Sequence, residues 1–160
     1  MKHLFIARHG NYGGDDLINA RGIAQMETLG QKIKEILNGG SAYIISSTAP
    51  RALGSSQVLS NFLTAPGKFE QVPYLWSGTD APKDSYYRDR DRDKLIDIVN
   101  QYRNKADGLI VVSHLEVGED FPEYFFRAEF QKSVRIGEIE KGEAVHIDLG
   151  SQVYKLLRQF

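Results

Sequence analysis

The chain has 160 residues, a length that suits one domain with a single hydrophobic core, and we expect residues 1–160 to form that domain. Its 20 Lys and Arg residues nearly balance its 21 Asp and Glu residues, which argues against a nucleic-acid-binding protein, because such proteins normally carry a basic excess. The lack of cysteine excludes a disulfide framework and a thiol nucleophile. No apolar run is long enough for a signal-peptide core or a membrane span, so we expect a cytoplasmic protein with no membrane partner.

The first predicted strand ends in two side chains capable of chemistry. The short apolar run Leu4–Ala7 is typical of a buried strand, and Arg8, His9 and Gly10 follow it directly. Open α/β sheets bind their ligands at the carboxyl ends of their strands. A guanidinium group is a rigid donor for phosphate or carboxylate oxygens, and a neutral imidazole can act as a nucleophile.

A helix, a strand and a second helix are predicted next. Asn19 is a suitable N-cap for a helix whose apolar residues recur with helical spacing over residues 23–37. The second apolar strand covers Ala42–Ser46, and Pro50 suits the first turn of a helix that we expect to run to about residue 63. Arg51 then lies in the first turn of this helix, where free N–H groups also attract anions.

The remainder of the chain continues the alternation of strands and helices. The predicted elements are a weak strand over 69–74, an irregular loop over 75–85, a helix following residues 88–94, a strand over 109–113, a helix over 122–130, and a closing hairpin of 144–149 and 152–157. Such alternation predicts an α/β fold of three layers, α/β/α, with a mostly parallel central sheet, helices on both faces and an antiparallel edge.

Three of the predicted strands lead to a cationic or imidazole side chain. Arg8 and His9 follow the first strand, Arg51 follows the second, and His114 follows the strand over 109–113. Because the carboxyl ends of parallel strands lie at one edge of a sheet, two histidines and two arginines are predicted to meet in one pocket.

At this point the sequence resembles the histidine phosphatase superfamily, also called phosphoglycerate mutase-like. The Arg8–Gly10 triplet after an N-terminal strand is the signature of that family. The segments Ile18–Gln25, Ser46–Ala52 and Val112–His114 match its first helix start, its serine-rich segment before a second arginine and its strand before a second histidine. The resemblance covers the chain nearly from end to end.

The resemblance implies a role for each residue of the predicted pocket. His9 would be the nucleophile that becomes phosphorylated, while Arg8, Arg51 and His114 hold the phosphoryl oxygens, with Asn11 as a further substrate-binding residue. Phosphoryl transfer depends mainly on in-line positioning and on stabilisation of charge at the equatorial oxygens, which two guanidinium groups and an imidazolium can supply. We therefore expect a reaction without a metal or another cofactor.

Two features set this chain apart from the larger members of the family. Leu115 follows the second histidine where larger members often have glycine, and together with the short chain this resembles the small phosphohistidine phosphatases. Larger members also supply an acidic residue that protonates the leaving group, and no clear equivalent is present. Asp80 is the first candidate for that acid, and Asp84 and Glu116 are the next.

The expected substrate class follows from the lack of a clear proton donor for the leaving group. Without one, the substrate should carry a leaving group that needs little protonation, and a phosphohistidine in a protein meets this condition. A phosphorylated small molecule is the other expected substrate class. The loops around Tyr12 and Trp76 are expected to set specificity.

Three other interpretations stay open from the sequence. A catalytically silent module that binds phosphate or phosphoproteins would use the same pocket. A phosphoglycerate mutase-type enzyme is disfavoured because the insertion that would enclose a small sugar acid is absent. A metal-dependent hydrolase would need His9, His114 and either Asp15 or Asp16 as ligands, although their spacing matches no known metal-binding motif.

Overall fold

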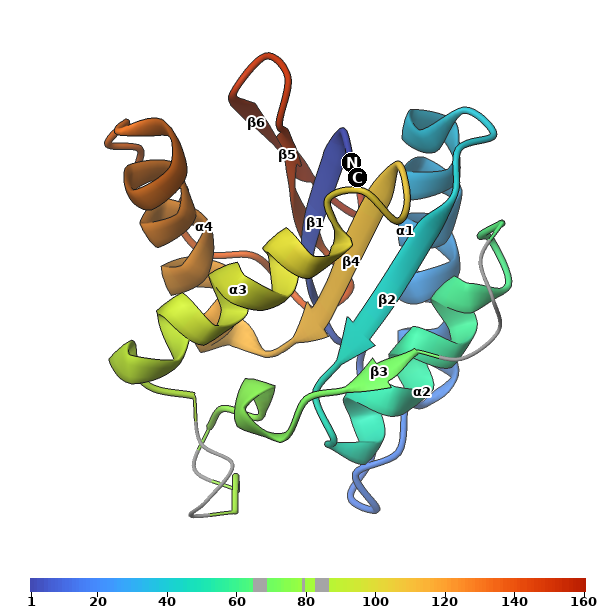
Figure 1. The fold of residues 1–160 in the computed structure, drawn as a ribbon. Helices are drawn as coiled ribbons and strands as arrows, with labels where there is room; N and C mark the ends of the chain where they lie inside the picture. The colour runs from blue at the N-terminus through green and yellow to red at the C-terminus, as the bar shows by residue number, and fades with distance from the viewer. Residues whose placement is uncertain (65–68, 79, 83–86) are drawn as a thin grey trace.

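The computed structural model describes residues 1–64, 69–78, 80–82 and 87–160, which form a six-stranded sheet in the order β3-β2-β4-β1-β5-β6 (Figure 1). The strands are β1 His3–Arg8, β2 Ala42–Ser46, β3 Glu70–Gln71, β4 Gly108–Ser113, β5 Ala144–Asp148 and β6 Val153–Leu157. Strands β3, β2, β4 and β1 run parallel, whereas β5 is antiparallel to β1 and β6 is antiparallel to β5. The predicted mostly parallel sheet with an antiparallel edge is confirmed.

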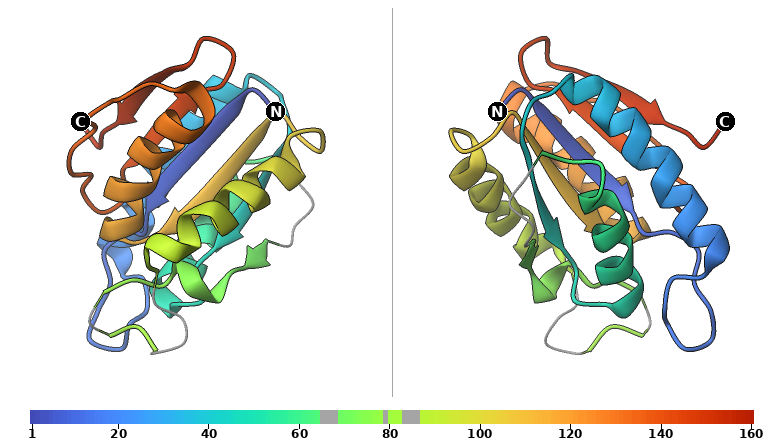
Figure 2. Two further views of the ribbon diagram at one scale, coloured as in Figure 1. Left: turned by 60° about the vertical axis from the view of Figure 1, so that its left-hand side comes forward. Right: turned by 90° about the vertical axis from the view of Figure 1, so that its right-hand side faces the viewer.

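Helices cover both faces of this sheet. The helices are α1 Ala20–Leu37, α2 Pro50–Ser60, α3 Arg92–Tyr102 and α4 Leu115–Phe130, with short 3₁₀ turns at Pro73–Leu75 and Asp89–Asp91. Figure 2 shows α3 and α4 over one face and α1 and α2 over the other. Side chains of a strand alternate between the two faces, so Leu4 and Ile6 of β1 pack with α3 and α4, and Phe5 and Ala7 pack with α1 and α2. The three-layer α/β/α architecture is confirmed.

Three predicted elements differ in extent from those observed. The strand predicted over 69–74 is reduced to β3 because Pro73, which has no N–H group to donate, starts a 3₁₀ turn. Helix α2 ends at Ser60 rather than near residue 63. Helix α4 begins at Leu115, so its predicted start at Pro122 is wrong: Pro122 lies inside the helix, and burial of apolar side chains on both sides of it outweighs the lost hydrogen bond.

The strand register brings the functional segments to one edge. Arg8 of β1 is opposite Ser113 of β4, and Ser46 of β2 is opposite Val112 of β4, so the three strands end at the same level. The residues that follow these strands therefore share this edge, together with the first turn of α2. None of the helices in the described parts of the chain has the length and apolar character needed to cross a membrane.

Candidate active site

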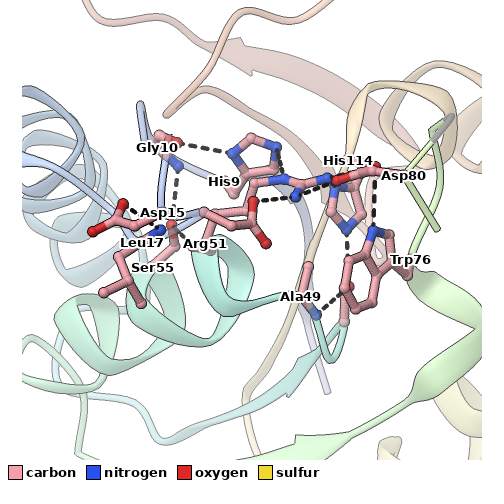
Figure 3. Close-up of polar contacts among 12 residues, drawn as sticks. His9, Gly10, Asp15, Leu17, Ala49, Arg51, Ser55, Trp76, Asp80 and His114 are labelled. Carbon is pink, nitrogen blue, oxygen red and sulfur yellow. Dashed lines mark hydrogen bonds and ion pairs between the residues drawn. The ribbon is translucent and has the colours of Figure 1, made fainter. Parts of the chain in front are cut away.

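His9 lies at the end of β1 with its ring held in one orientation and one tautomer. Its backbone N–H donates to the carbonyl of Ser113 at 2.9 Å, and its Nδ1 lies 2.8 Å from the carbonyl oxygen of Gly10 (Figure 3). A carbonyl can only accept a hydrogen bond, so Nδ1 carries the proton and Nε2 keeps a lone pair. Nε2 accepts a hydrogen bond from Nε of Arg51 at 3.3 Å.

The surroundings of His9 keep its imidazole neutral. Burial is the largest effect, and the positive charges of Arg51, Arg8 and Lys141 act in the same direction, so the pKa of His9 falls to about 3 despite the opposing hydrogen bond to Gly10. A neutral imidazole whose Nε2 carries no proton is the form that can attack phosphorus.

Arg51 occupies the first turn of α2 and is 3% exposed. The carboxylate of Asp80 accepts two hydrogen bonds from it, from Nη1 at 2.7 Å and from Nη2 at 3.1 Å (Figure 3). Asp16 accepts another hydrogen bond from Nη1. Burial alone would lower the pKa of the Arg51 guanidinium, but the two carboxylates outweigh it and the pKa lies above its ordinary value. The positive charge of Arg51 is thus already balanced by two carboxylates.

His114 follows β4 and completes the centre of the site. Its ring centroid lies 5.1 Å from that of His9. Nη2 of Arg51 donates to its Nδ1 at 3.3 Å, so its Nε2 carries the proton and donates to the Ser47 hydroxyl at 2.8 Å. Burial, then His9 and then Arg51 lower the pKa of His114 to about 2, so this ring is also neutral while the site holds no anion.

Arg8 lines the same cavity as the two histidines and keeps hydrogen-bonding capacity. The cavity has a volume of about 450 Å³, and its lining residues are Arg8, His9, Tyr12, Arg51, Ser77, Gly78, Asp80, His114, Leu115, Glu116 and Lys141. Nη1 of Arg8 donates to the carbonyl of Ile139 at 2.9 Å, while its buried Nε has no hydrogen-bond partner within the described segments. The structure therefore brings together all four residues that the sequence placed in one pocket.

Two of the three candidate acids line the cavity. Asp80 lines the cavity, with its side chain 50% exposed and paired with Arg51. Partial burial would raise the pKa of Asp80, but the hydrogen bonds and charge of Arg51 lower it, so Asp80 is ionised in this state. Glu116 also lines the cavity, where it accepts a hydrogen bond from the hydroxyl of Ser77. Asp84 lies outside the described residues.

Asn11 lies beside the cavity rather than in its wall. It lines a neighbouring space of about 580 Å³, to which Arg8 and Lys141 also contribute. Its backbone N–H donates to the side chain of Gln25 at 2.8 Å, which fixes the loop after His9. Within the described residues, no group of three or more His, Cys, Asp or Glu side chains is arranged to hold a metal ion.

Sequence reasoning missed Lys141, Asp16 as a partner of Arg51, and Ser47 as a partner of His114. Lys141 reaches the site because β5 runs antiparallel to β1, which places the residues before β5 at the carboxyl end of β1. The predicted antiparallel hairpin was the signal that could have directed attention to this loop. Tyr12, whose loop was expected to set specificity, lies with its ring centroid 5.2 Å from that of His9.

Comparison with known proteins gives matches at the level of structure. Neither family models nor curated proteins match the sequence. The protein histidine phosphatase SixA complexed with tungstate matches with a TM-score of 0.65 at 14% identity, over 98% of this chain and 97% of that chain. The alpha-ribazole phosphatase from Shigella flexneri matches with a TM-score of 0.64 at 15% identity, over 96% and 94%. The phosphoglycerate mutase from Plasmodium falciparum matches with a TM-score of 0.55 at 20% identity, over 97% and 87%. This chain therefore has the phosphoglycerate mutase-like fold that these three solved structures share.

Proposed function

We propose that this protein is a phosphatase that transfers a phosphoryl group first to Nε2 of His9 and then to water. The observation that carries this proposal is the fixed tautomer of His9, whose lone pair on Nε2 lies among Arg51, Arg8 and His114. A nucleophile surrounded by oxyanion ligands is the arrangement that phosphoryl transfer requires.

The chemistry proceeds in two displacements. In the first, the Nε2 lone pair of His9 forms a bond to phosphorus while the bond from phosphorus to the leaving group breaks, and the leaving group keeps the electron pair. The proton stays on Nδ1, and its hydrogen bond to the carbonyl of Gly10 stabilises the positive charge on the phosphorylated ring. In the second, water attacks phosphorus, the P–N bond breaks, and its electron pair returns to Nε2.

Asp80 is the proposed proton donor to a leaving group that needs one. In the empty site Asp80 is paired with Arg51 and ionised. A phosphate dianion bound to Arg51 displaces that carboxylate, and its negative charge raises the pKa of Asp80 toward the range where it holds a proton. Asp80 then donates this proton to the leaving group and takes one back from the attacking water.

We propose phosphohistidine in a protein as the preferred substrate. Its leaving imidazole can depart already protonated, so it does not depend on an acid that is ionised in the empty site. The similarity to a protein histidine phosphatase that holds the oxoanion tungstate supports this choice. A small phosphate ester is the second candidate, because Asp80 and Glu116 both line the cavity and can protonate an ester oxygen.

The test is hydrolysis of p-nitrophenyl phosphate in excess EDTA by wild type, His9→Ala and His3→Ala. His3 is the matched control, because it lies at the other end of β1 and contacts His146 rather than the cavity. We expect turnover that resists EDTA in wild type and His3→Ala, and a loss of at least about 1,000-fold in His9→Ala. Alkaline quenching of the wild-type reaction should trap a phosphorylated peptide containing His9.

Other results would select a different function. Phosphate binding without turnover in wild type would indicate the silent binding module, loss of turnover in EDTA would indicate a metal-dependent hydrolase, and full turnover in His9→Ala would refute His9 as the nucleophile. A phosphohistidine peptide and a phosphoserine peptide of matched sequence then test the substrate class. Equal or faster turnover of the phosphoserine peptide would overturn the preference for phosphohistidine.

A further inference from the structure

Binding a phosphate dianion in this cavity requires more positive charge than Arg51 provides. In the empty site Asp80 and Asp16 both pair with its guanidinium, so Arg51 together with these two partners carries no net positive charge. A phosphate dianion at His9 needs compensating positive charge nearby, because His9, Arg51 and His114 are themselves buried and solvate an ion less well than water does. Arg8 supplies one such charge.

Lys141 is held at this cavity by the backbone of the catalytic strand itself. Gly142, the next residue, donates its N–H to the carbonyls of Arg8 at 3.2 Å and His9 at 3.1 Å. Gly142 has a φ of +77°, a conformation that favours glycine, and a Cβ there would lie 2.5 Å from the side chain of Gln25. The loop that carries Lys141 is therefore fixed directly against the nucleophile.

The ammonium group of Lys141 lies among other cations. Its Nζ is 4.6 Å from the ring centroid of Tyr12, and Cζ of Arg51 is 4.8 Å from the same centroid. Within the described residues it forms no salt bridge. Burial, then Arg8, then Arg51 and Arg21 lower the pKa of Lys141. An anion in the cavity would relieve this repulsion.

We propose that Lys141 is a further catalytic residue, whose ammonium binds a phosphoryl oxygen at His9 and supplies positive charge in addition to that of Arg51, which phosphate can bind only by displacing Asp80 and Asp16. This inference rests on the proposed function, since it assigns a ligand to the same site. The competing interpretation is that Lys141 only orders the ring of Tyr12.

The experiment compares Lys141→Gln, Lys141→Arg and Lys155→Gln with wild type. Lys155 is the matched control, because it is an exposed lysine of the edge strand β6 and lines no part of the His9 cavity. The measurements are calorimetric binding of inorganic phosphate, inhibition by orthovanadate, and kcat/KM for p-nitrophenyl phosphate. Loss of one charge-assisted hydrogen bond predicts that Lys141→Gln weakens binding of both anions by about 10- to 100-fold, with Lys155→Gln unchanged and Lys141→Arg largely restored.

The pH dependence separates a charged ligand from a merely structural side chain. If Lys141 binds the anion, the affinity of wild type for phosphate falls at alkaline pH as its ammonium group loses its proton. This decrease should be absent in Lys141→Gln and should move to higher pH in Lys141→Arg, because guanidinium does not lose its proton there. An unchanged alkaline decrease in both variants would overturn the proposal, and Lys141→Arg keeps this test decisive if Lys141→Gln fails to fold.

The remaining outcomes distinguish this inference from the proposed function. Turnover in wild type with equal phosphate affinity in Lys141→Gln and Lys155→Gln would refute the role of Lys141 and leave the phosphatase proposal intact. No turnover in wild type, with phosphate binding weakened only in Lys141→Gln, would refute the phosphatase proposal and support Lys141 as an anion ligand.

Discussion

Asp16 competes with phosphate for Arg51, and its replacement by asparagine should tighten phosphate binding. The Asp16 side chain is 30% exposed and pairs with Nη1 of a guanidinium group that is almost completely buried. Asp16 has a φ of +63°, in the left-handed region that Asp and Asn adopt more readily than other side chains. The substitution Asp16→Asn therefore removes one negative charge and preserves the backbone of the loop.

The expected gain follows from the difference between a charged and a neutral hydrogen bond. A hydrogen bond to a charged group contributes about 1.5–3 kcal/mol and a neutral one about 0.5–1.5 kcal/mol, so the exchange is worth about 1 kcal/mol. Solvent screening at the partly exposed carboxylate keeps the effect at this lower level. A phosphate anion that displaces residue 16 from Arg51 should then bind about fivefold more tightly to Asp16→Asn than to wild type.

Calorimetric titration with inorganic phosphate at neutral pH measures this change. Asp15→Asn is the matched control, because Asp15 accepts a hydrogen bond from the N–H of Leu17 at 3.1 Å, which an asparagine oxygen can also accept, and is not among the partners of Arg51. Phosphate affinity in Asp15→Asn should change by less than about twofold. Unchanged or weaker phosphate binding in Asp16→Asn would show that Asp16 stays on Arg51 in the complex and would refute the competition.

Two further predictions concern proton transfer and acid stability. Asp80→Asn should slow the hydrolysis of an alkyl phosphate by about 100-fold or more and that of p-nitrophenyl phosphate far less, because only the poor leaving group needs a proton. Equal losses in kcat/KM on the two substrates would exclude Asp80 as the acid. Burial, and then the neighbouring His3, lower the pKa of His146 from 6.5 to about 4, so between these values the unfolded chain binds more protons than the folded one. The stability contributed by the neutral ring is present above about pH 6.5 and is lost as the pH falls toward 4. Between pH 7 and pH 4.5, the free energy of unfolding measured in urea should therefore fall less in His146→Gln than in wild type. Equal decreases in the two proteins would contradict this origin.

Local sequence patterns were sufficient to predict the central strands of the sheet and the functional residues that follow them. The apolar runs of β1, β2 and β4 are short and uninterrupted, so each predicts a buried strand from neighbouring residues alone. Once these strands are parallel, their carboxyl ends share an edge, and His9, Arg51 and His114 are brought together. Local patterns misjudged α4, because a proline usually marks a helix start and here the packing of the helix outweighs its cost.

The sequence by itself determined the fold class and the four residues predicted to surround a phosphoryl group, because both follow from elements that local periodicity defines. Only the tertiary structure decided which charges surround them. Asp16 and Asp80 reach Arg51 from loops of irregular conformation, and Lys141 reaches the cavity because Ala144 of β5 pairs with Ala7 of β1. Such contacts depend on long-range register and loop conformation, which leave no periodic signal in the chain.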